Sequence, residues 1–489
     1  MLILIGMLLL SGFWYVSRFT SEQDLPRLSS GTERDTSHGP VTGFQDDGVD
    51  VWLGIPFASP PIGELRWKAH RPPEPWKEPL SANQFGSECP QNMVGFSGDE
   101  DCLYLNVWSP AESKDLAPVM FFIHGGGNHL GSANAGGLYD GQRFASKFGV
   151  VLVSIHYRLG PLGWFSHPSF SVGDKSDWAK KDESGNYGTL DILAALEWTR
   201  DNIERFGGDP ENVTIFGESA GGIAVLGLNA APAADGLFHK AIAHSPNGPQ
   251  WPGGDKTGEM AEKLGVDQSE LLDKLRGMST QEIIKAGLPV GHAIDGTVVT
   301  RPFKEAILEK GKNGVPIIVG TNRTEGTLFT PPDSNDEDIE RYQNMLPGTA
   351  KSVDSDPKRY VEGIRAAYPE QNAKRLFEIV MTDSFRRIAV EIAESAFQAR
   401  VGSWLYRFDL PTTLEYNGKL TESMHACEMA FTFNSYADSD CIVFAVYDPD
   451  LPEVRRLATQ WSGTLTRFAW TGDPNGAGLP EWSQYKEGS

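Results

Sequence analysis

The chain has 489 residues and a formal net charge of −22 at pH 7, from 43 Lys and Arg against 65 Asp and Glu. This acidity argues against nucleic acid as a partner, because a phosphate backbone needs a basic surface. The 13 Trp and 25 Phe are ample for a large core. No segment repeats at a fixed period, which argues against a solenoid or a propeller.

The N-terminal segment differs in composition from the rest, since Met1–Val16 carries no charged side chain. As a helix it would be about 24 Å long, shorter than the ~30 Å hydrocarbon core of a bilayer. We interpret residues 1–19 as a signal peptide or an N-terminal membrane anchor, and residues 20–39 as a flexible tether without a core pattern. Either interpretation exports residues 40–489 as one domain that is secreted, periplasmic or held at the membrane. A misassigned start is the remaining alternative.

Four cysteines form two sequence-local pairs, Cys89 with Cys102 and Cys427 with Cys441. A disulfide that closes a loop of this length contributes ~3 kcal/mol to stability on the chain-entropy model. Export to an oxidising compartment predicts a disulfide for the first pair and makes the second pair a candidate. Four free thiols would be expected in a cytosolic protein.

Apolar stretches along the remaining chain alternate between strand and helix patterns. An opening hairpin is predicted from Val41–Phe44 and Val49–Leu53, around a turn at Asp46-Asp47-Gly48. Core strands are predicted at 119–123, 150–155, 213–216, 241–243, 315–319 and 404–406, and helices at 192–206 and 451–468. This alternation predicts an α/β fold in a single domain, with a mostly parallel central sheet covered by helices on both faces.

The strand predicted at 213–216 runs directly into Gly217-Glu218-Ser219-Ala220-Gly221, and an apolar stretch able to form a helix follows. A serine between glycines at a sharp turn from strand to helix is the nucleophile elbow of an α/β-hydrolase. The short pattern G-x-S-x-G also occurs by chance, so the partners of Ser219 decide its meaning.

A serine hydroxyl needs a base to take its proton and an acid to orient that base. In α/β-hydrolases the acid follows the serine and the histidine follows the acid. Of the histidines after Ser219, which are His239, His244, His292 and His425, only His425 leaves room for a strand that carries the acid before it.

The candidate acid is Glu325, which comes just after the strand predicted at 315–319. Catalytic groups in open α/β sheets gather at the carboxyl ends of strands, so this position favours a role at the site. Asp295 and Asp354 are rivals by chain order alone, and neither directly follows so clear a strand.

A glycine triplet, Gly125-Gly126-Gly127, follows the strand predicted at 119–123. Its backbone N–H groups can approach a substrate and stabilise an oxyanion, and loss of one such donor typically costs ~10²–10³ in rate. The N–H of Ala220 in the elbow is the expected partner donor. A glycine triplet can also form a phosphate loop, but no Lys-Ser/Thr follows this one.

Together these motifs resemble the type-B carboxylesterases, the α/β-hydrolases that include bacterial and fungal esterases, some lipases and the cholinesterases. The resemblance runs from about Gly43 to Tyr485 and is carried, besides the elbow, by GIPFASPPIG at 54–63, EDCLYLNV at 100–107, YRLGPLG at 157–163 and FGGDP at 206–210. It implies a catalytic triad of Ser219, Glu325 and His425. It also implies an oxyanion hole of Gly126, Gly127 and Ala220, and a disulfide between Cys89 and Cys102.

Two positions depart from the family pattern. His244-Ser245-Pro246-Asn247 stands where Gln-Ser-Gly is usual, and His156 stands where Asn is usual. The first departure puts the geometry of a loop near the site in doubt, but not the triad. Because the chain is shorter than the cholinesterases, their aromatic gorge and choline site cannot be carried over.

The sequence therefore predicts a secreted or membrane-tethered serine carboxylesterase that acts on small ester substrates and needs no metal or organic cofactor. A lipase acting on longer-chain acylglycerols is the alternative within the same class. A non-catalytic adhesion protein on this fold would lack the serine or the histidine, and both are present. Activity is expected to fall below pH roughly 6–6.5, because His425 must be neutral to act as a base.

Overall fold

The computed structural model describes residues 25–93, 95–113, 115–165, 179–247, 251–252, 257–286, 293–330, 336–415, 420–435, 446–476 and 478–487. The segment interpreted as a signal or anchor lies outside the described residues, as do Cys441 and His292. Among the described helices, none combines the length and the apolar character that a membrane crossing requires.

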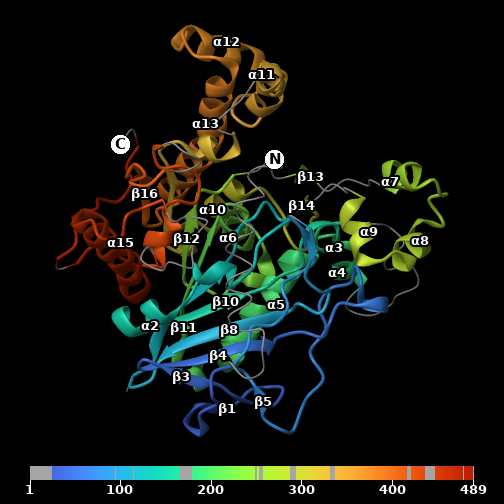
Figure 1. Cartoon of the computed structure of the whole chain (residues 1–489), viewed down its shortest axis with the longest axis vertical. Helices are drawn as coiled ribbons and strands as arrows, with labels where there is room; N and C mark the ends of the chain where they lie inside the picture. The colour runs from blue at the N-terminus through green and yellow to red at the C-terminus, as the bar shows by residue number, and fades with distance from the viewer. Residues whose placement is uncertain are drawn as a thin grey trace.

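One large sheet forms the centre of the molecule (Figure 1). In spatial order its described strands are β16 (Ser403–Phe408), β15 (Ile317–Asn322), β12 (Lys240–His244), β11 (Gly208–Glu218), β9 (Ala117–Ile123), β10 (Val151–Ile155), β8 (Tyr104–Pro110), β4 (Val49–Pro56) and β3 (Phe44–Asp46). The strands from β16 to β10 are parallel, and β8, β4 and β3 extend the sheet in antiparallel pairing. The predicted mostly parallel sheet is confirmed.

Helices cover both faces of this sheet, because the buried strands are apolar on both sides. In β9, Phe121 and Ile123 pack into one core, and Met120 and Phe122 pack into the core on the opposite face. The first core is shared with α5 (Tyr187–Asn202), α6 (Ala220–Asn229), α10 (Phe303–Lys310) and α13 (Ala373–Gln398), and the second with α2 (Gln142–Phe148), α14 (Met429–Thr432) and α15 (Pro452–Thr471). The helices predicted at 192–206 and 451–468 are α5, with the 3₁₀ turn that follows it, and α15.

Short elements connect these layers. The small strand pairings join β1 (Glu33–Asp35), β2 (Pro40–Thr42) and β5 (Leu80–Ser81), β6 (Gln91–Asn92) with β7 (Phe96–Ser97), and β13 (Trp251–Pro252) with β14 (Ala293–Ile294). The remaining described α-helices of the main body are α3 (Gly160–Gly163), α4 (Ala179–Glu183), α7 (Thr257–Leu264), α8 (Leu271–Gly277) and α9 (Thr280–Lys285).

The N-terminal part of the folded region corrects two boundaries. The predicted hairpin is β3 with β4, in which Phe44 faces Val51, whereas the preceding residues form β2 in a separate small sheet. A flexible tether extending to residue 39 is wrong for residues 30–39, because β1 pairs with β2 and the indole N–H of Trp52 donates to the Thr32 carbonyl at 2.7 Å. Backbone hydrogen bonds order this polar stretch, and a hydropathy pattern cannot predict backbone hydrogen bonds.

A helical unit projects from the main body (Figure 1). It consists of α11 (Asp336–Ala350), α12 (Pro357–Ala367) and the first half of α13, and it has a small core of its own around Tyr342, Leu346 and Phe377. The second half of α13 packs against the main sheet through Ile392 and neighbouring alanines. One continuous helix therefore joins the projecting unit to the body.

The first predicted disulfide, Cys89–Cys102, is present in the structure. Cys427, from the second candidate pair, is a buried free thiol. Its candidate partner Cys441 lies outside the described residues.

A buried ion pair joins the segment after β10 to α5. The guanidinium of Arg158 donates to both carboxylate oxygens of Asp191 at 2.8 and 2.6 Å, and its side chain is only 3% exposed. The backbone N–H of Arg158 also donates to Asp191 at 3.1 Å. Asp191 therefore pairs with both the guanidinium and the backbone N–H of Arg158, and its removal would leave a buried cation without its carboxylate partner.

We expect Asp191→Ala to lower the free energy of unfolding by about 3–5 kcal/mol for this reason. Urea denaturation followed by circular dichroism measures the loss. Asp201→Ala is the matched control, because its pair with Arg200 is 48% exposed on both sides, and exposed pairs contribute only about 0–1 kcal/mol. Equal losses in the two variants would contradict this assignment.

Candidate active site

The predicted elbow lies between β11 and α6. Ser219 has φ 57° and ψ −120°, a strained conformation for a residue with a side chain, and its N–H donates to the His244 carbonyl at 2.9 Å. Gly221 is required for the turn, since a Cβ there would lie 2.0 Å from the Ile123 carbonyl oxygen of the neighbouring strand. The serine is therefore presented at the carboxyl edge of the sheet by close backbone packing.

Glu325 and His425 meet at the same edge. Glu325 opens the 3₁₀ turn η8 (Glu325–Phe329) just after β15, and His425 lies on the segment between β16 and α14. His425 Nδ1 lies 2.6 Å from Glu325 Oε2, and both side chains are buried. The carboxylate thus fixes one ring nitrogen and orients the imidazole.

The rival acids lie elsewhere. Asp295 accepts hydrogen bonds from the backbone N–H groups of Thr297 and Val298 and from the side chain of Asn186. Asp354 pairs with Arg359 of α12 in the projecting unit. Both have structural partners of their own, so chain order alone was a weak guide.

Glu325 is held by two further donors. Its Oε1 accepts from the Ser245 hydroxyl at 2.7 Å and from the Asn322 N–H at 2.6 Å. The N–H of Thr324 donates to the Ser423 carbonyl at 2.9 Å, which joins the loop carrying Glu325 to the loop carrying His425. Glu325 and His425 are therefore fixed relative to each other by backbone as well as by side chains.

Helix α13 holds the same loop from the outside. The Thr382 hydroxyl accepts from the N–H of Gly326 at 3.1 Å, and Glu378 accepts from the Thr330 hydroxyl at 2.5 Å. The Phe385 ring lies 4.7 Å from the His425 ring, centroid to centroid. The helix that carries the projecting unit therefore also packs behind Glu325 and His425.

A second carboxyl group, which the sequence did not single out, contacts the histidine. Glu218 Oε1 lies 3.0 Å from His425 Nε2, without the alignment of a hydrogen bond. Within the described residues, no hydrogen bond joins the Ser219 hydroxyl to the imidazole. The sequence signal that could have identified Glu218 is its position: it is a charged residue next to Ser219, at the end of a strand predicted to be buried.

Charge and burial act together on this cluster. Burial raises the pKa of Glu218 to about 8 and that of Glu428 to about 7. Burial by itself lowers the pKa of His425, but the carboxylates of Glu218, Glu325 and Glu428 outweigh it and raise the pKa to about 9. The surroundings therefore stabilise the imidazolium form.

Glu428 belongs to the same buried network, and sequence reasoning missed it as well. It accepts from the Asn322 side chain and, at 3.2 Å, from the hydroxyl of Tyr406. His244 Nδ1 lies 2.8 Å from that hydroxyl. Burial lowers the pKa of His244 to about 3, so this departure from the family pattern is a neutral core residue.

His156, the other departure, is also a neutral core histidine. Burial lowers its pKa to about 3, and its Nε2 lies 3.4 Å from the Ser132 hydroxyl. His156 directly follows β10, and its ring lies beside the ring of His124, which precedes the glycine triplet. With pKa values this low, both unusual histidines bind a proton too weakly to act as general bases near pH 7.

The glycine triplet lies against the elbow. A Cβ on Gly125 would be 2.7 Å from Glu218 Oε2 and 3.1 Å from Ser219 Cβ. Within the described residues, the N–H groups of Gly126, Gly127 and Ala220 donate to no acceptor. Free donors beside a nucleophile are what an oxyanion site requires.

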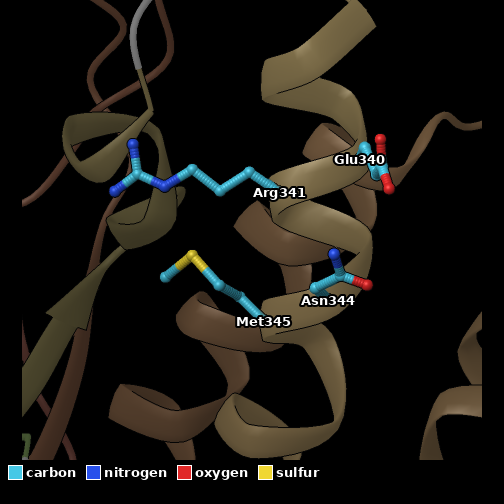
Figure 2. Close-up of a pocket in the computed structure, with 4 residues that line it drawn as sticks. All are labelled: Glu340, Arg341, Asn344 and Met345. Atoms are coloured by element: carbon cyan, nitrogen blue, oxygen red, sulfur yellow. The ribbon is translucent and has the colours of Figure 1, made fainter.

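The described residues contain no group of three or more His, Cys, Asp or Glu side chains placed to hold a metal ion. A shallow depression on the projecting unit is lined by Glu340, Arg341, Asn344 and Met345, which come from successive turns of α11 alone (Figure 2). These residues converge on no point, so we assign the depression no role.

A family model described as the Carboxylesterase family matches residues 30–489. The chain belongs to the carboxylesterase family. It is 35% identical over 481 residues to the para-nitrobenzyl esterase of Bacillus subtilis (strain 168), which covers 92% of each chain. It is 32% identical to the fumonisin B1 esterase of Sphingopyxis macrogoltabida, over 95% of this chain and 86% of that one. As a member of this family it is a carboxylic ester hydrolase.

Solved structures agree with this assignment. A PNB esterase superposes with a TM-score of 0.80 at 32% identity, covering 93% of this carboxylesterase and 94% of that chain. A carboxylesterase of Geobacillus stearothermophilus superposes with a TM-score of 0.78 at the same identity and coverage. The α/β-hydrolase fold expected from the sequence is confirmed.

Glu218→Gln tests the charge cluster through the pH dependence of kcat/KM. A base acts only when neutral, so a pKa of about 9 for His425 moves the acid limb upward from the 6–6.5 expected from sequence. Removing the Glu218 charge lowers that pKa, and the limb should move to lower pH by about 1–3 units. Glu211→Gln, an exposed change on the same strand, should leave the limb in place. An unmoved limb in Glu218→Gln would contradict the proposed coupling.

Proposed function

We propose that this carboxylesterase hydrolyses small carboxylic esters through an acyl-enzyme on Ser219, with His425 as the base and Glu325 as the acid that orients it. The observation that carries the proposal is the 2.6 Å contact between His425 Nδ1 and Glu325, at the strand ends where the strained Ser219 is presented. Free backbone donors at Gly126 and Ala220 beside the serine support the same chemistry.

In the first half of the reaction, His425 Nε2 takes the proton of the Ser219 hydroxyl as its oxygen attacks the ester carbonyl. The carbonyl oxygen becomes an oxyanion, which the N–H groups of Gly126, Gly127 and Ala220 stabilise. The carbon–oxygen bond to the alcohol then breaks, and the alcohol leaves with the proton from Nε2. The acyl group stays on Ser219 as an ester.

In the second half, water attacks the acyl-enzyme while Nε2 takes one of its protons. The second tetrahedral intermediate collapses, the carboxylic acid leaves, and the serine regains its proton. The imidazolium occurs twice in the cycle, and each time it lies between the carboxylates of Glu325 and Glu218. The same groups also stabilise the imidazolium of the resting enzyme, so they assist the reaction only at a pH where His425 starts as the free base.

The surroundings favour neutral esters with apolar groups. Phe329 lies 5.3 Å from the His425 ring, centroid to centroid, and is 41% exposed, so an apolar face adjoins the base. The net charge of −22 on the chain disfavours anionic substrates. The named activities of the relatives, esterases of para-nitrobenzyl and fumonisin B1 esters, agree with ester hydrolysis in general.

Export of the enzyme is part of the proposal. The Cys89–Cys102 disulfide supports it, because such bonds persist in oxidising compartments. The uncharged stretch Met1–Val16 would act as a cleaved signal or as a membrane tether. Mass spectrometry of the N-terminus of the protein recovered from cells separates the two, and recovery from the cytosol would contradict export.

Ser219→Ala should reduce hydrolysis of p-nitrophenyl acetate by about 10⁶-fold, to the level left by the remaining site. The fold should be unchanged, because alanine keeps the Cβ and the backbone contacts of the elbow. Stopped assays with purified protein measure the rate, and circular dichroism checks the fold. Ser146→Ala, at an exposed position of helix α2, is the matched control and should retain full activity. Hydrolysis that survives in Ser219→Ala would overturn the mechanism.

A panel of p-nitrophenyl esters separates the esterase from the lipase alternative. We expect the highest kcat/KM on short acyl chains in solution, because the apolar surface beside His425 is a compact pair of phenylalanines. A lipase would instead gain activity on long-chain emulsions. Varying the acyl chain and the alcohol separately shows which side contacts Phe329. Preference for emulsified palmitate esters would favour the lipase.

A further inference from the structure

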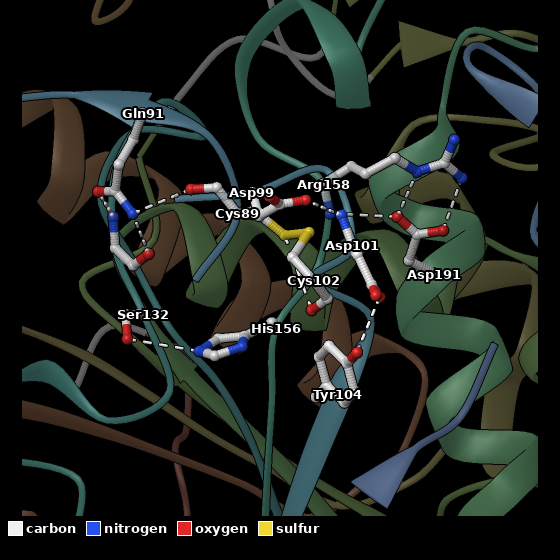
Figure 3. Close-up of a disulfide and its surroundings, with 11 residues drawn as sticks. Cys89, Gln91, Asp99, Asp101, Cys102, Tyr104, Ser132, His156, Arg158 and Asp191 are labelled. Atoms are coloured by element: carbon white, nitrogen blue, oxygen red, sulfur yellow. Dashed lines mark hydrogen bonds and ion pairs between the residues drawn. A yellow bond between two sulfur atoms is a disulfide. The ribbon is translucent and has the colours of Figure 1, made fainter. Parts of the chain in front are cut away.

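The loop that carries the glycine triplet ends at Gly131, where a single side chain holds its backbone. The amide of Gln91 donates from Nε2 to the Gly131 carbonyl at 3.0 Å and accepts from the Gly131 N–H at Oε1, also at 3.0 Å. Figure 3 shows this amide facing the loop backbone beside the disulfide. Gln91 is 5% exposed. The Gln91 side chain thus makes the same pair of hydrogen bonds, one donated and one accepted, that a neighbouring strand would make with the backbone of Gly131.

The rest of the loop is tied to itself and to its neighbours. The carbonyl of Gly126 accepts from the N–H groups of His129 and Leu130 at 3.1 and 3.0 Å, which closes a tight turn. The Asn128 carbonyl accepts from the Gly160 N–H at 2.6 Å. These bonds hold the turn together, and the pairing of Gly131 with Gln91 holds its C-terminal end.

Gln91 is itself anchored by the disulfide. It lies on the short hairpin β6–β7, inside the loop that Cys89 and Cys102 close. Its Nε2 also donates to the Cys89 carbonyl at 3.2 Å. Cys102 lies two residues before the start of β8 of the central sheet. A continuous connection therefore runs from the sheet through the disulfide to Gln91 and on to the glycine loop.

We infer that Gln91 is a positioning residue for the N–H groups of Gly126 and Gly127, and that the Cys89–Cys102 disulfide affects catalysis through it. The inference rests on the proposed function, because it assigns those N–H groups to the oxyanion. Such donors stabilise the transition state only when they are aligned before the reaction, so a loosened loop loses rate without losing substrate binding.

The test compares Gln91→Met with the wild-type enzyme. Methionine matches the length of glutamine but makes neither hydrogen bond to Gly131. We expect kcat per active site to fall by about 10–100-fold, somewhat less than for complete loss of a donor, with KM changed less than about 2-fold. Active sites are titrated with a fluorophosphonate, so a smaller folded fraction cannot mimic the effect.

A trifluoromethyl ketone gives the decisive reading. Addition of Ser219 to this inhibitor creates an oxyanion in the same place as in the reaction, so its inhibition constant should rise by the same factor as kcat falls. Asn92→Ala, exposed on the same hairpin, is the matched control and should change neither value. Gln91→Ala, with its thermal unfolding recorded, repeats the test if the methionine variant folds poorly.

The role of the disulfide is tested by non-additivity. The double variant Cys89→Ser and Cys102→Ser, assayed at low temperature where it stays folded, should lower kcat and weaken the inhibitor in the same direction. Adding Gln91→Met to it should change both values by less than about 2-fold, because the two changes act through one connection. Full additivity of the two effects would overturn the link to the disulfide.

The outcomes separate this inference from the proposed function. If Ser219→Ala kept its activity, the proposed function would fail and the inference with it. If Ser219 is required but Gln91→Met keeps its kcat and its inhibition constant, only the positioning role of Gln91 is overturned. Parallel loss of kcat and inhibitor affinity, with KM preserved, supports it.

Discussion

His425 is only 4% exposed and lies between two carboxyl groups, with Nδ1 2.6 Å from Glu325 and Nε2 3.0 Å from Glu218. A buried charge is costly unless it is paired, so this pairing decides which protonation state the imidazole adopts. The hydrogen bonds from Ser245 and Asn322 to Glu325 matter because they hold one half of that pair in place. The central sheet and the loops that follow its strands bring these groups together.

The parallel sheet brings these residues together. Ser219, Glu325 and His425 are far apart in sequence, yet each follows a strand whose carboxyl end lies at the same edge of the sheet. The backbone pairing of β11, β12 and β15 fixes the relative heights of these ends to the register of the hydrogen bonds. The entropy of bringing the residues together is therefore lost in folding the sheet, before any substrate arrives.

The sequence was informative where function leaves a local pattern or a fixed order. The elbow around Ser219 has both, and chain order with strand ends then pointed to Glu325 and His425. Glu218 and Gln91 escaped because their roles depend on distances across the fold, and an isolated polar residue has no periodicity. The ordered segment 30–39 was missed for a similar reason, since backbone pairing rather than apolar side chains holds it.

The chain order of the site also has a consequence for when the enzyme becomes active during its synthesis. His425 is separated from Ser219 by most of the second half of the chain, and α14 and α15, which seal the sheet behind it, come later still. Contacts between such distant segments form late in folding. On the mechanism proposed above, a nascent chain that already displays Ser219 has no base until His425 is in place, so the newly made protein would be inert toward esters until almost the last helix has been translated and packed.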